Sequence, residues 1–583
     1  MAKTHKDLPD ECWELILNKL HHQHHSLLEA PSLTCKRFLS LTNALRTHLT
    51  IVVPALFLPL PTLLDRFPNL TSIKARFFCG GDLHRLITVI ATSNLNLQTL
   101  DFRLNDGLPL ESWRLLGSCM NNIKVLICLG LRTLTDIELP VIADSMSCLE
   151  DLDISYPIYE FGSVHELQGR SLGDVGVTDS GIEVLSSKLK SLRKINVSGN
   201  EFLTDKSLIA LSTNCVYLTD IVAHNCVLIT SDGIEFVVRN SSNLSLLSID
   251  GIKFGSLDDS SICCARKLST LQIHDSVVPD GYLRLLAKAD IPLKSFTLSD
   301  CIVTFSVISS VLKKYSSLES LSFYGIDELT DEKMSDLSQY LSALVVIGLD
   351  CCNNLTELTF FKLARNCPLL KDISMVGMNL GGGGDGATDI VQNPRMKSLN
   401  LANNLNLSDD CLAKLTSVCP NLEVLLVSSC MGITEKGIAE FLKSCSKVRS
   451  LRIDECGLIK SIGNGFELSQ VDFLGATRSG IDDYGLVVIA NRCRELRNLN
   501  LEGCLEVTTV GLNEILTNCE KLKKINLTGC LHVRPETIDW MVFSRPSLRE
   551  IILSEASLPS ESQRKLFLRH GCDVLSEEAG LEC

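Results

Sequence analysis

Apolar residues recur along most of this chain with a period close to 26 residues. Counted from an anchor at position 0, they return at positions 3, 6, 8 and often 14, and position 11 is Cys or Asn. The turn that begins at Cys419 has Leu422, Leu425, Val427, Cys430 and Ile433 at these positions. Anchors fall at residues 67, 94, 120, 146, 189, 215, 241, 265, 290, 315, 341, 367, 393, 419, 445, 467, 493, 519 and 545, and twelve of the eighteen intervals are 26 residues. Such regularity predicts one repeat architecture of about nineteen turns.

Each repeat is predicted to form a strand, a loop and a helix. Positions 6 and 8 are two residues apart, so on a strand both face the core, whereas position 7 faces outward. In residues 433–445, Thr434 is a plausible N-cap, and Ile438, Phe441 and Leu442 have helical spacing. Strands stack about 4.8 Å apart and helices need about 8–10 Å, so the stack must curve. The expected fold is an α/β solenoid with a parallel sheet on the concave side and helices on the convex side.

Many of the 25 cysteines recur at positions 0 and 11 of the repeat, and none of the 25 forms a Cys-x-x-Cys pair. Cys215 and Cys226, like Cys445 and Cys456, are 11 residues apart. Small side chains at these positions are expected to pack or to satisfy turn backbone groups, as free Cys does in a reducing compartment. Metal or redox chemistry is the alternative, and no metal site or cofactor is predicted.

A short helical module is predicted ahead of the repeats. Residues 8–20 place Trp13, Ile16, Leu17 and Leu20 at helical spacing, and Phe38, Leu41, Leu45 and Leu49 form one stripe of a second helical stretch. These helices could simply cap the solenoid, whose first turn would otherwise expose its core. The predicted organisation is a helical module at 1–50, a junction at 51–66, the solenoid at 67–570 and a tail at 571–583. Segment 156–176 fits the repeat poorly and is either a degenerate turn or an inserted loop.

The net charge of −14 disfavours a nucleic-acid ligand, because phosphate binding needs clustered Lys and Arg. The apolar stretch at 51–64 contains three prolines and is too short to cross a membrane, and residues 1–11 have no apolar run suited to a signal peptide. A cytoplasmic or nuclear location is expected, with no membrane contact. The glycine run at 381–386 lacks the Lys-Ser/Thr of a phosphate-binding loop, and no catalytic constellation is apparent, so the protein is not expected to be an enzyme.

Several features of the sequence resemble F-box/LRR-repeat proteins of the plant type. They are both cysteine positions, the helix start Thr178-Asp179-Ser180-Gly181, the segment Leu8-Pro9-Asp10-Glu11 and the segment 33–38 (LTCKRF). The resemblance implies a leucine-rich-repeat solenoid behind an F-box that docks on a Skp-type adaptor and, through it, a cullin. The chain would then be the non-catalytic substrate-recognition subunit of an SCF-type E3 ubiquitin ligase. The implied adaptor contacts are Leu8, Pro9, Ile16, Leu17, Leu33, Cys35 and Lys36. The histidines at 21, 22, 24 and 25 depart from the family pattern.

The outward strand positions are the expected surface for a protein substrate of unknown identity. The candidates are Arg103, Asp153, His224, Asp250, His274, Tyr324 and Asp350. The middle turns are mainly acidic and polar, so a basic or hydrogen-bonding segment is the expected ligand. Two alternatives remain open: a non-ligase scaffold with a helical cap, and a small-molecule, hormone-like co-receptor with a pocket near segment 156–176 or the glycine run.

Overall fold

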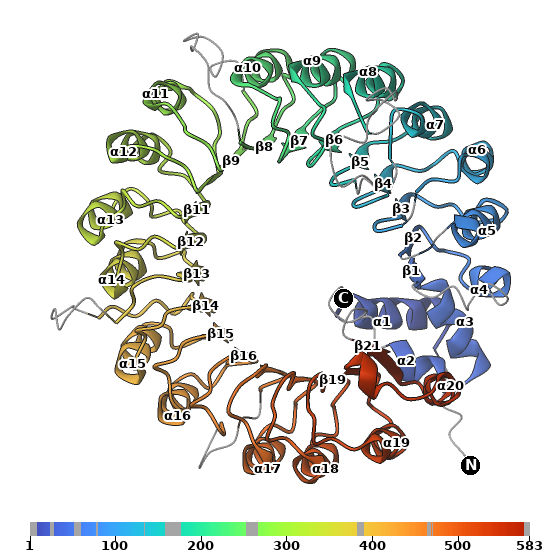
Figure 1. Cartoon of the computed structure of the whole chain (residues 1–583), viewed down its shortest axis with the longest axis vertical. Helices are drawn as coiled ribbons and strands as arrows, with labels where there is room; N and C mark the ends of the chain where they lie inside the picture. The colour runs from blue at the N-terminus through green and yellow to red at the C-terminus, as the bar shows by residue number, and fades with distance from the viewer. Residues whose placement is uncertain are drawn as a thin grey trace. The chain divides into compact units, whose positions relative to one another are not determined.

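The computed structural model describes residues 8–23, 28–51, 60–76, 78, 80–105, 107–132, 134–157, 176–251, 266–381, 390–462, 468 and 470–576. The chain forms two compact units, Met1–Pro292 and Leu293–Cys583. In each unit the strands line the inner, concave side and the helices cover the outer side (Figure 1). The predicted α/β leucine-rich-repeat solenoid is confirmed. Two segments singled out in the sequence lie outside the described residues. They are the glycine run beyond Gly381 and segment 156–176, of which only the first two residues and the last are described.

The first unit begins with three helices and continues with parallel strands. The helices are α1 (Asp10–Gln23), α2 (Glu29–Ser32) and α3 (Lys36–Ala44). The strands are β1 (His48–Ile51), β2 (Ser72–Ala75), β3 (Thr99–Asp101), β4 (Val125–Ile127), β5 (Asp151–Asp153), β6 (Lys194–Asn196), β7 (Asp220–Ala223), β8 (Leu246–Asp250) and β9 (Thr270–His274). The outer helices are α4 (Leu60–Arg66), α5 (Gly80–Ala91), α6 (Leu110–Cys119), α7 (Glu138–Ser145), α8 (Asp179–Lys188), α9 (Asp205–Asn214), α10 (Ser231–Asn240) and α11 (Asp280–Lys288).

The second unit repeats the same pattern to the C-terminal end. Its strands are β10 (Ser295–Ser299), β11 (Ser320–Tyr324), β12 (Val346–Asp350), β13 (Asp372–Ser374), β14 (Ser398–Asn400), β15 (Val424–Leu426), β16 (Ser450–Arg452), β17 (Phe473–Gly475), β18 (Asn498–Asn500), β19 (Lys524–Asn526), β20 (Glu550–Leu553) and β21 (Asp573–Ser576). Its helices are α12 (Phe305–Lys314), α13 (Asp331–Ser338), α14 (Glu357–Asn366), α15 (Asp409–Ser417), α16 (Glu435–Ser444), α17 (Asp483–Arg492), α18 (Thr509–Asn518), α19 (Pro535–Ser544) and α20 (Glu561–Arg569).

The core follows the predicted positions. Leu425 and Val427, at positions 6 and 8, are fully buried, and so are Ile438 and Phe441 of helix α16. Every predicted anchor is followed by a strand, from β2 to β20. Adjacent strands pair with equal repeat positions opposite each other, as Leu425 does with Leu451. Each turn therefore stacks its apolar positions on those of its neighbours.

Strand pairing corrects one anchor. Leu474 pairs with Leu451 and with Leu499, which are both at position 6. The anchor of this turn is therefore Leu468 and not residue 467. The sequence misled because Phe473 is apolar, yet its half-buried ring lies on the inner face, where the guanidinium of Arg452 is 4.7 Å from the ring centroid.

The sheet is longer than predicted at both ends. Strand β1 pairs with β2, with Leu49 opposite Ile73, at the predicted border between helical module and junction. The prediction that Leu49 continues the second helical stripe is wrong, because helix α3 ends at Ala44. Strand β21 pairs with β20, with Val574 opposite Ile551, inside the predicted tail. Both strands stand next to an incomplete repeat, so too few apolar positions mark them in the sequence.

The residue at position 10 ends each strand with a left-handed backbone. Positive φ occurs there in every turn from Leu104 to Gly529, at both glycine and non-glycine residues. A position with this conformation favours Gly, Asn or Asp. Cys351, Glu455 and Arg478 adopt it as well, with φ of 54°, 60° and 49°. The turn geometry is therefore imposed by stacking of the repeats and not by the local residue alone.

In several turns, the Cys or Asn at position 11 donates a hydrogen bond that links adjacent turns. The thiols of Cys430, Cys456 and Cys530 each donate to a backbone carbonyl of the preceding turn at 3.1 Å. In another turn Asn404 Nδ2 does the same, to Met375 O at 2.8 Å. Burial raises the pKa of Cys430 to about 12, so its thiol keeps the hydrogen that it donates. This confirms the predicted structural role of position 11.

The Thr-Asp-x-Gly helix start forms a second link between turns. Thr434 caps helix α16, and its backbone N–H donates to Asp409 Oδ1 of the preceding turn at 2.8 Å. A Cβ atom on Gly437 would overlap the same carboxylate oxygen. The motif needs glycine here because the aspartate of the preceding turn fills the space above the helix.

Candidate protein-binding surfaces

The N-terminal helices pack around a small core of their own. Leu17, Leu28 and Leu41 are buried, with Trp13 and Phe38 packed beside them, their ring centroids 4.8 Å apart. Arg37 of helix α3 donates to Asp10 Oδ1 at 2.5 Å and to Leu8 O at 2.7 Å. Cys35 caps helix α3, and its sulfur accepts from the Phe38 N–H at 3.5 Å. The hydrogen bond from this N–H is the main cause of the lowered pKa of Cys35. These contacts fix the start of helix α1 against helix α3.

Helix α1 carries a second apolar stripe that this core does not use. Leu8, Leu15 and Ile16 are 42%, 72% and 42% exposed, and Leu33, which follows helix α2, is 83% exposed. Residues 12, 15 and 16 share one face of helix α1, away from the face of Trp13 and Leu17, and Leu8 lies just before the helix. Leu15 was not among the predicted contacts, because it lies outside the stripe that the hydrophobic spacing first suggested.

The predicted adaptor contacts divide into two groups. Leu8, Pro9, Ile16, Leu33, Cys35 and Lys36 are exposed. Leu17 is 2% exposed and belongs to the core of the module, so its side chain has no surface to offer a partner. Of the four histidines, two fall at the end of helix α1 and two lie outside the described residues, and none of the four side chains is described.

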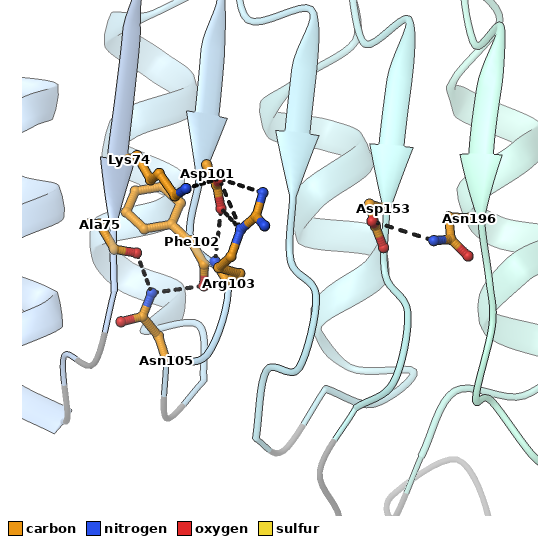
Figure 2. Close-up of polar contacts among 8 residues, drawn as sticks. All are labelled: Lys74, Ala75, Asp101, Phe102, Arg103, Asn105, Asp153 and Asn196. Atoms are coloured by element: carbon orange, nitrogen blue, oxygen red, sulfur yellow. Dashed lines mark hydrogen bonds and ion pairs between the residues drawn. The ribbon is translucent and has the colours of Figure 1, made fainter. Parts of the chain in front are cut away.

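On the inner face of the first unit, the carboxylate of Asp101 is neutralised by basic side chains. Figure 2 shows Arg103 folded back onto Asp101, with 2.7 Å between guanidinium and carboxylate, and Lys74 Nζ lies 3.9 Å from the same carboxylate. Asp153, two strands further along, accepts instead from Ser155 and, at 3.4 Å, from Asn196 Nδ2. Arg103 and Asp153 therefore lie in separate hydrogen-bond networks with strand β4 between them.

Three predicted residues come together at strands β7 to β9. His224 follows β7, and Asp250 pairs with His274 across β8 and β9. The rings of His224 and His274 meet edge to face, with centroids 5.1 Å apart. Burial lowers the pKa of His224, and Asp250 opposes this shift. Ser248 and Gln272 complete the cluster; the sequence places them at position 7, but they carry no charge and were not selected as candidates.

The other two candidates meet in the second unit. Tyr324 is 42% exposed and pairs with Asp350 across strands β11 and β12. A hydrogen bond with Cys351, together with the charges of Asp300 and Asp350, raises the pKa of Tyr324. Asp300 and Cys351 were missed because they occupy position 10, which the strand pattern does not assign to either face.

The inner carboxylates differ in charge compensation. Asp101 pairs with Arg103, and Asp454 lies 4.0 Å from Arg452. By contrast, Asp153, Asp250 and Asp350 form no ion pair with any described residue; they accept only from backbone N–H, hydroxyl or amide groups. The middle turns therefore present negative charge that the described residues do not neutralise.

A groove of about 1210 Å³ lies on the outer side of the first unit. It is lined by the start of helix α8, by helix α9 along its length and by the flanking turns, with Ile137, Phe202, Ile209 and Leu228 beside Glu183 and Lys206. Asp136 and Asp179 also line it, but both already accept hydrogen bonds from the threonine of the next turn. The groove is thus lined by both apolar and polar side chains.

No protein-family model matches the chain. The BTB/POZ domain-containing protein FBL11 of Arabidopsis thaliana is 22% identical over 438 residues, which are 68% of this chain and 43% of that protein. The putative F-box/LRR-repeat protein 23 of the same plant is 28% identical over 143 residues, 22% of this chain and 31% of that protein. F-box/LRR-repeat protein 4 of Bos taurus is 27% identical over 115 residues, 19% and 18% of the two chains.

The chain is similar to F-box/LRR-repeat proteins. It spans less than half the length of the curated relatives that it matches. Among solved structures, the yeast Rad7–Elc1 complex covers 69% of this chain and 89% of its own at 15% identity and a TM-score of 0.39. The TLR13–ssRNA13 complex covers 88% and 81% at 14% identity and a TM-score of 0.48. Likenesses this distant carry no functional conclusion.

In the part of the chain that the structure describes, no helix has both the length and the apolar composition to cross a membrane.

Proposed function

We propose that this chain is the non-catalytic substrate-recognition subunit of an SCF-type E3 ubiquitin ligase. Its helical module docks on a Skp-type adaptor, and through it a cullin, while the inner face of the repeats holds a protein substrate. Similarity to F-box/LRR-repeat proteins supports this assignment. The protein then contributes proximity between substrate and ligase and performs no bond chemistry itself.

The observation that carries the proposal is the exposed apolar stripe of the helical module. Leu15 and Leu33 are more than two thirds exposed, in a module whose own core is already filled by other side chains. Exposed apolar side chains that gather on a small module are typical of a binding surface. We propose Leu8, Pro9, Leu15, Ile16, Leu33, Cys35 and Lys36 as the adaptor contacts, and we leave out Leu17 because it is buried.

The unpaired inner carboxylates support substrate recognition by the repeats. Asp153, Asp250 and Asp350 meet no described cation, so a basic partner gains their full attraction without competing against an internal ion pair. Arg103 contributes less, because Asp101 already holds its guanidinium. We propose a substrate segment that carries Lys or Arg.

The test is capture of a purified Skp-type adaptor by the full chain. A Leu15→Ser/Ile16→Ser/Leu33→Ser variant should lose roughly a hundredfold or more in affinity, because each apolar side chain contributes about 1.5–3 kcal/mol when it is buried. The matched control is Val216→Ser/Val227→Ser/Val277→Ser, which changes three side chains of the repeats that are 62%, 55% and 63% exposed. Circular dichroism confirms that both variants are folded.

Each outcome has a clear meaning. Capture by the wild type and the control but not by the helical-module variant supports the ligase subunit. If neither wild type nor control captures adaptor, the helices are a cap and the chain is a scaffold. Substrate capture that depends on an added small molecule would instead favour the co-receptor function.

A further inference from the structure

Strands β7, β8 and β9 present a polar cluster with a fixed direction of hydrogen bonding. Ser248 lies opposite Gln272 and Asp250 opposite His274 on adjacent strands, and His224 follows β7 directly. Ser248 is 1% exposed even though it is on the inner face, because the neighbouring side chains cover it. The cluster is therefore packed, and its groups are held in place without a ligand.

The direction follows from the single hydrogen of the Ser248 hydroxyl. Ser248 Oγ donates to Gln272 Oε1 at 2.8 Å, so it can only accept from His224 Nε2, 2.7 Å away. His224 is consequently protonated on Nε2 and carries a lone pair on Nδ1. Its ring is further held by the edge contact with His274.

Two polar groups of this cluster have no partner among the described residues. The Nδ1 of His224 is an acceptor, and the Nε2 amide group of Gln272 is a donor whose orientation is fixed by the bond at Oε1. Next to them, Asp250 uses Oδ1 to accept from the Asn225 N–H and forms no ion pair with a described residue. The site offers one acceptor, one donor and one negative charge.

We propose, on the basis of the substrate-recognition function above, that these strands bind an extended protein segment that carries Lys or Arg. Its backbone carbonyl accepts from Gln272 Nε2, its backbone N–H donates to His224 Nδ1, and its basic side chain pairs with Asp250. The segment is extended because a helix uses its own N–H and C=O groups internally. Nucleic acid does not fit, because its phosphates would meet the Asp250 carboxylate.

The experiment uses two libraries of random decapeptides, one with a fixed central arginine and one with a fixed central glutamate, and the immobilised full chain. Arginine peptides should be retained and glutamate peptides should not. Asp250→Asn keeps the oxygen that accepts from Asn225, and should weaken binding of the selected peptide about tenfold. The control is Glu183→Gln on helix α8, which removes the same charge on the outer side and should leave peptide binding unchanged.

Two further measurements test the backbone contacts. Gln272→Glu keeps the acceptor for Ser248 but removes the amide donor, and should also weaken binding about tenfold. N-methylation of one amide of the selected peptide should weaken binding to the wild type, and this effect should be absent in His224→Phe. Equal retention of both libraries, or an unchanged affinity in Asp250→Asn, would overturn the proposal.

Adaptor capture by the same preparation separates the two proposals. Intact capture without peptide selection overturns the peptide site alone. Peptide selection without adaptor capture overturns the ligase function and leaves the peptide site standing.

Discussion

Two asparagines at position 11 of the repeat should respond differently to the same substitution. Asn105 Nδ2 donates to Ala75 O at 3.0 Å (Figure 2), and its Oδ1 accepts from the Phe78 N–H at 2.7 Å. Asn200 also donates to the preceding turn, at 3.1 Å, but its buried Oδ1 has no partner. The residue that corresponds to Phe78 in that preceding turn is Pro157, which has no N–H to give.

The perturbation is Asn→Cys at each site, because Cys is the residue found most often at position 11. A thiol at position 11 can still donate to a backbone carbonyl of the preceding turn, as the thiol of Cys430 does. Its sulfur is only a weak acceptor for the backbone N–H at position 11 of that preceding turn. Asn105→Cys removes the Oδ1 that accepts from the buried Phe78 N–H, and loss of this hydrogen bond costs about 1–3 kcal/mol. Asn200→Cys removes an oxygen that was already unsatisfied, so its cost should be close to zero. The expected difference is therefore about 1–3 kcal/mol.

The assay is urea unfolding followed by far-ultraviolet circular dichroism under reducing conditions. Because repeat proteins can unfold in steps, hydrogen exchange of the two affected turns should accompany the melting curves. Equal destabilisation at both sites would refute the reasoning. A sharper check is Pro157→Ala, which restores the missing N–H; in that background Asn200→Cys should become as costly as Asn105→Cys.

Three further predictions concern two contacts between turns and the reactivity of two cysteines. Gly437→Ala should lower stability by about 1–3 kcal/mol in thermal melts because its Cβ would overlap a carboxylate oxygen, whereas Gly457→Ala, with nothing within 4 Å, should be nearly neutral. Burial alone would raise the pKa of Asp179, but hydrogen bonds from the next turn outweigh burial and lower the pKa. The ionised Asp179 therefore stabilises the fold at pH values above its ordinary pKa. This stabilisation is lost as the pH falls through the lowered pKa of the folded state. Asp179→Asn should therefore show a shallower loss of stability between pH 5 and about pH 2, measured by chemical denaturation. Iodoacetamide at pH 8 should label Cys35, which is exposed and has a lowered pKa, before Cys430, whose buried thiol has a pKa of about 12, as peptide mapping would show.

The binding surfaces were only partly predictable from the sequence. Outward strand positions selected His224, Asp250 and His274 as separate candidates, and the structure brings them together because parallel strands in register place equal positions side by side. The same rule could not tell that Arg103 is held by Asp101, since that depends on side-chain conformation. In the helical module, spacing alone put Ile16 and Leu17 on one stripe, whereas packing buries Leu17 and exposes Ile16.

The sequence by itself determined the repeat, the strand of each turn, the helix of most turns, and the buried role of Cys and Asn at position 11. This was possible because each turn of a solenoid contacts only its neighbours, so the packing pattern is written at short and regular separations along the chain. The tertiary structure alone decided the anchor at Leu468, the two terminal strands and the directed hydrogen bonds from His224 to Gln272. These features depend on how side chains and backbone groups of neighbouring turns contact each other. The spacing of residues within one turn does not predict such contacts.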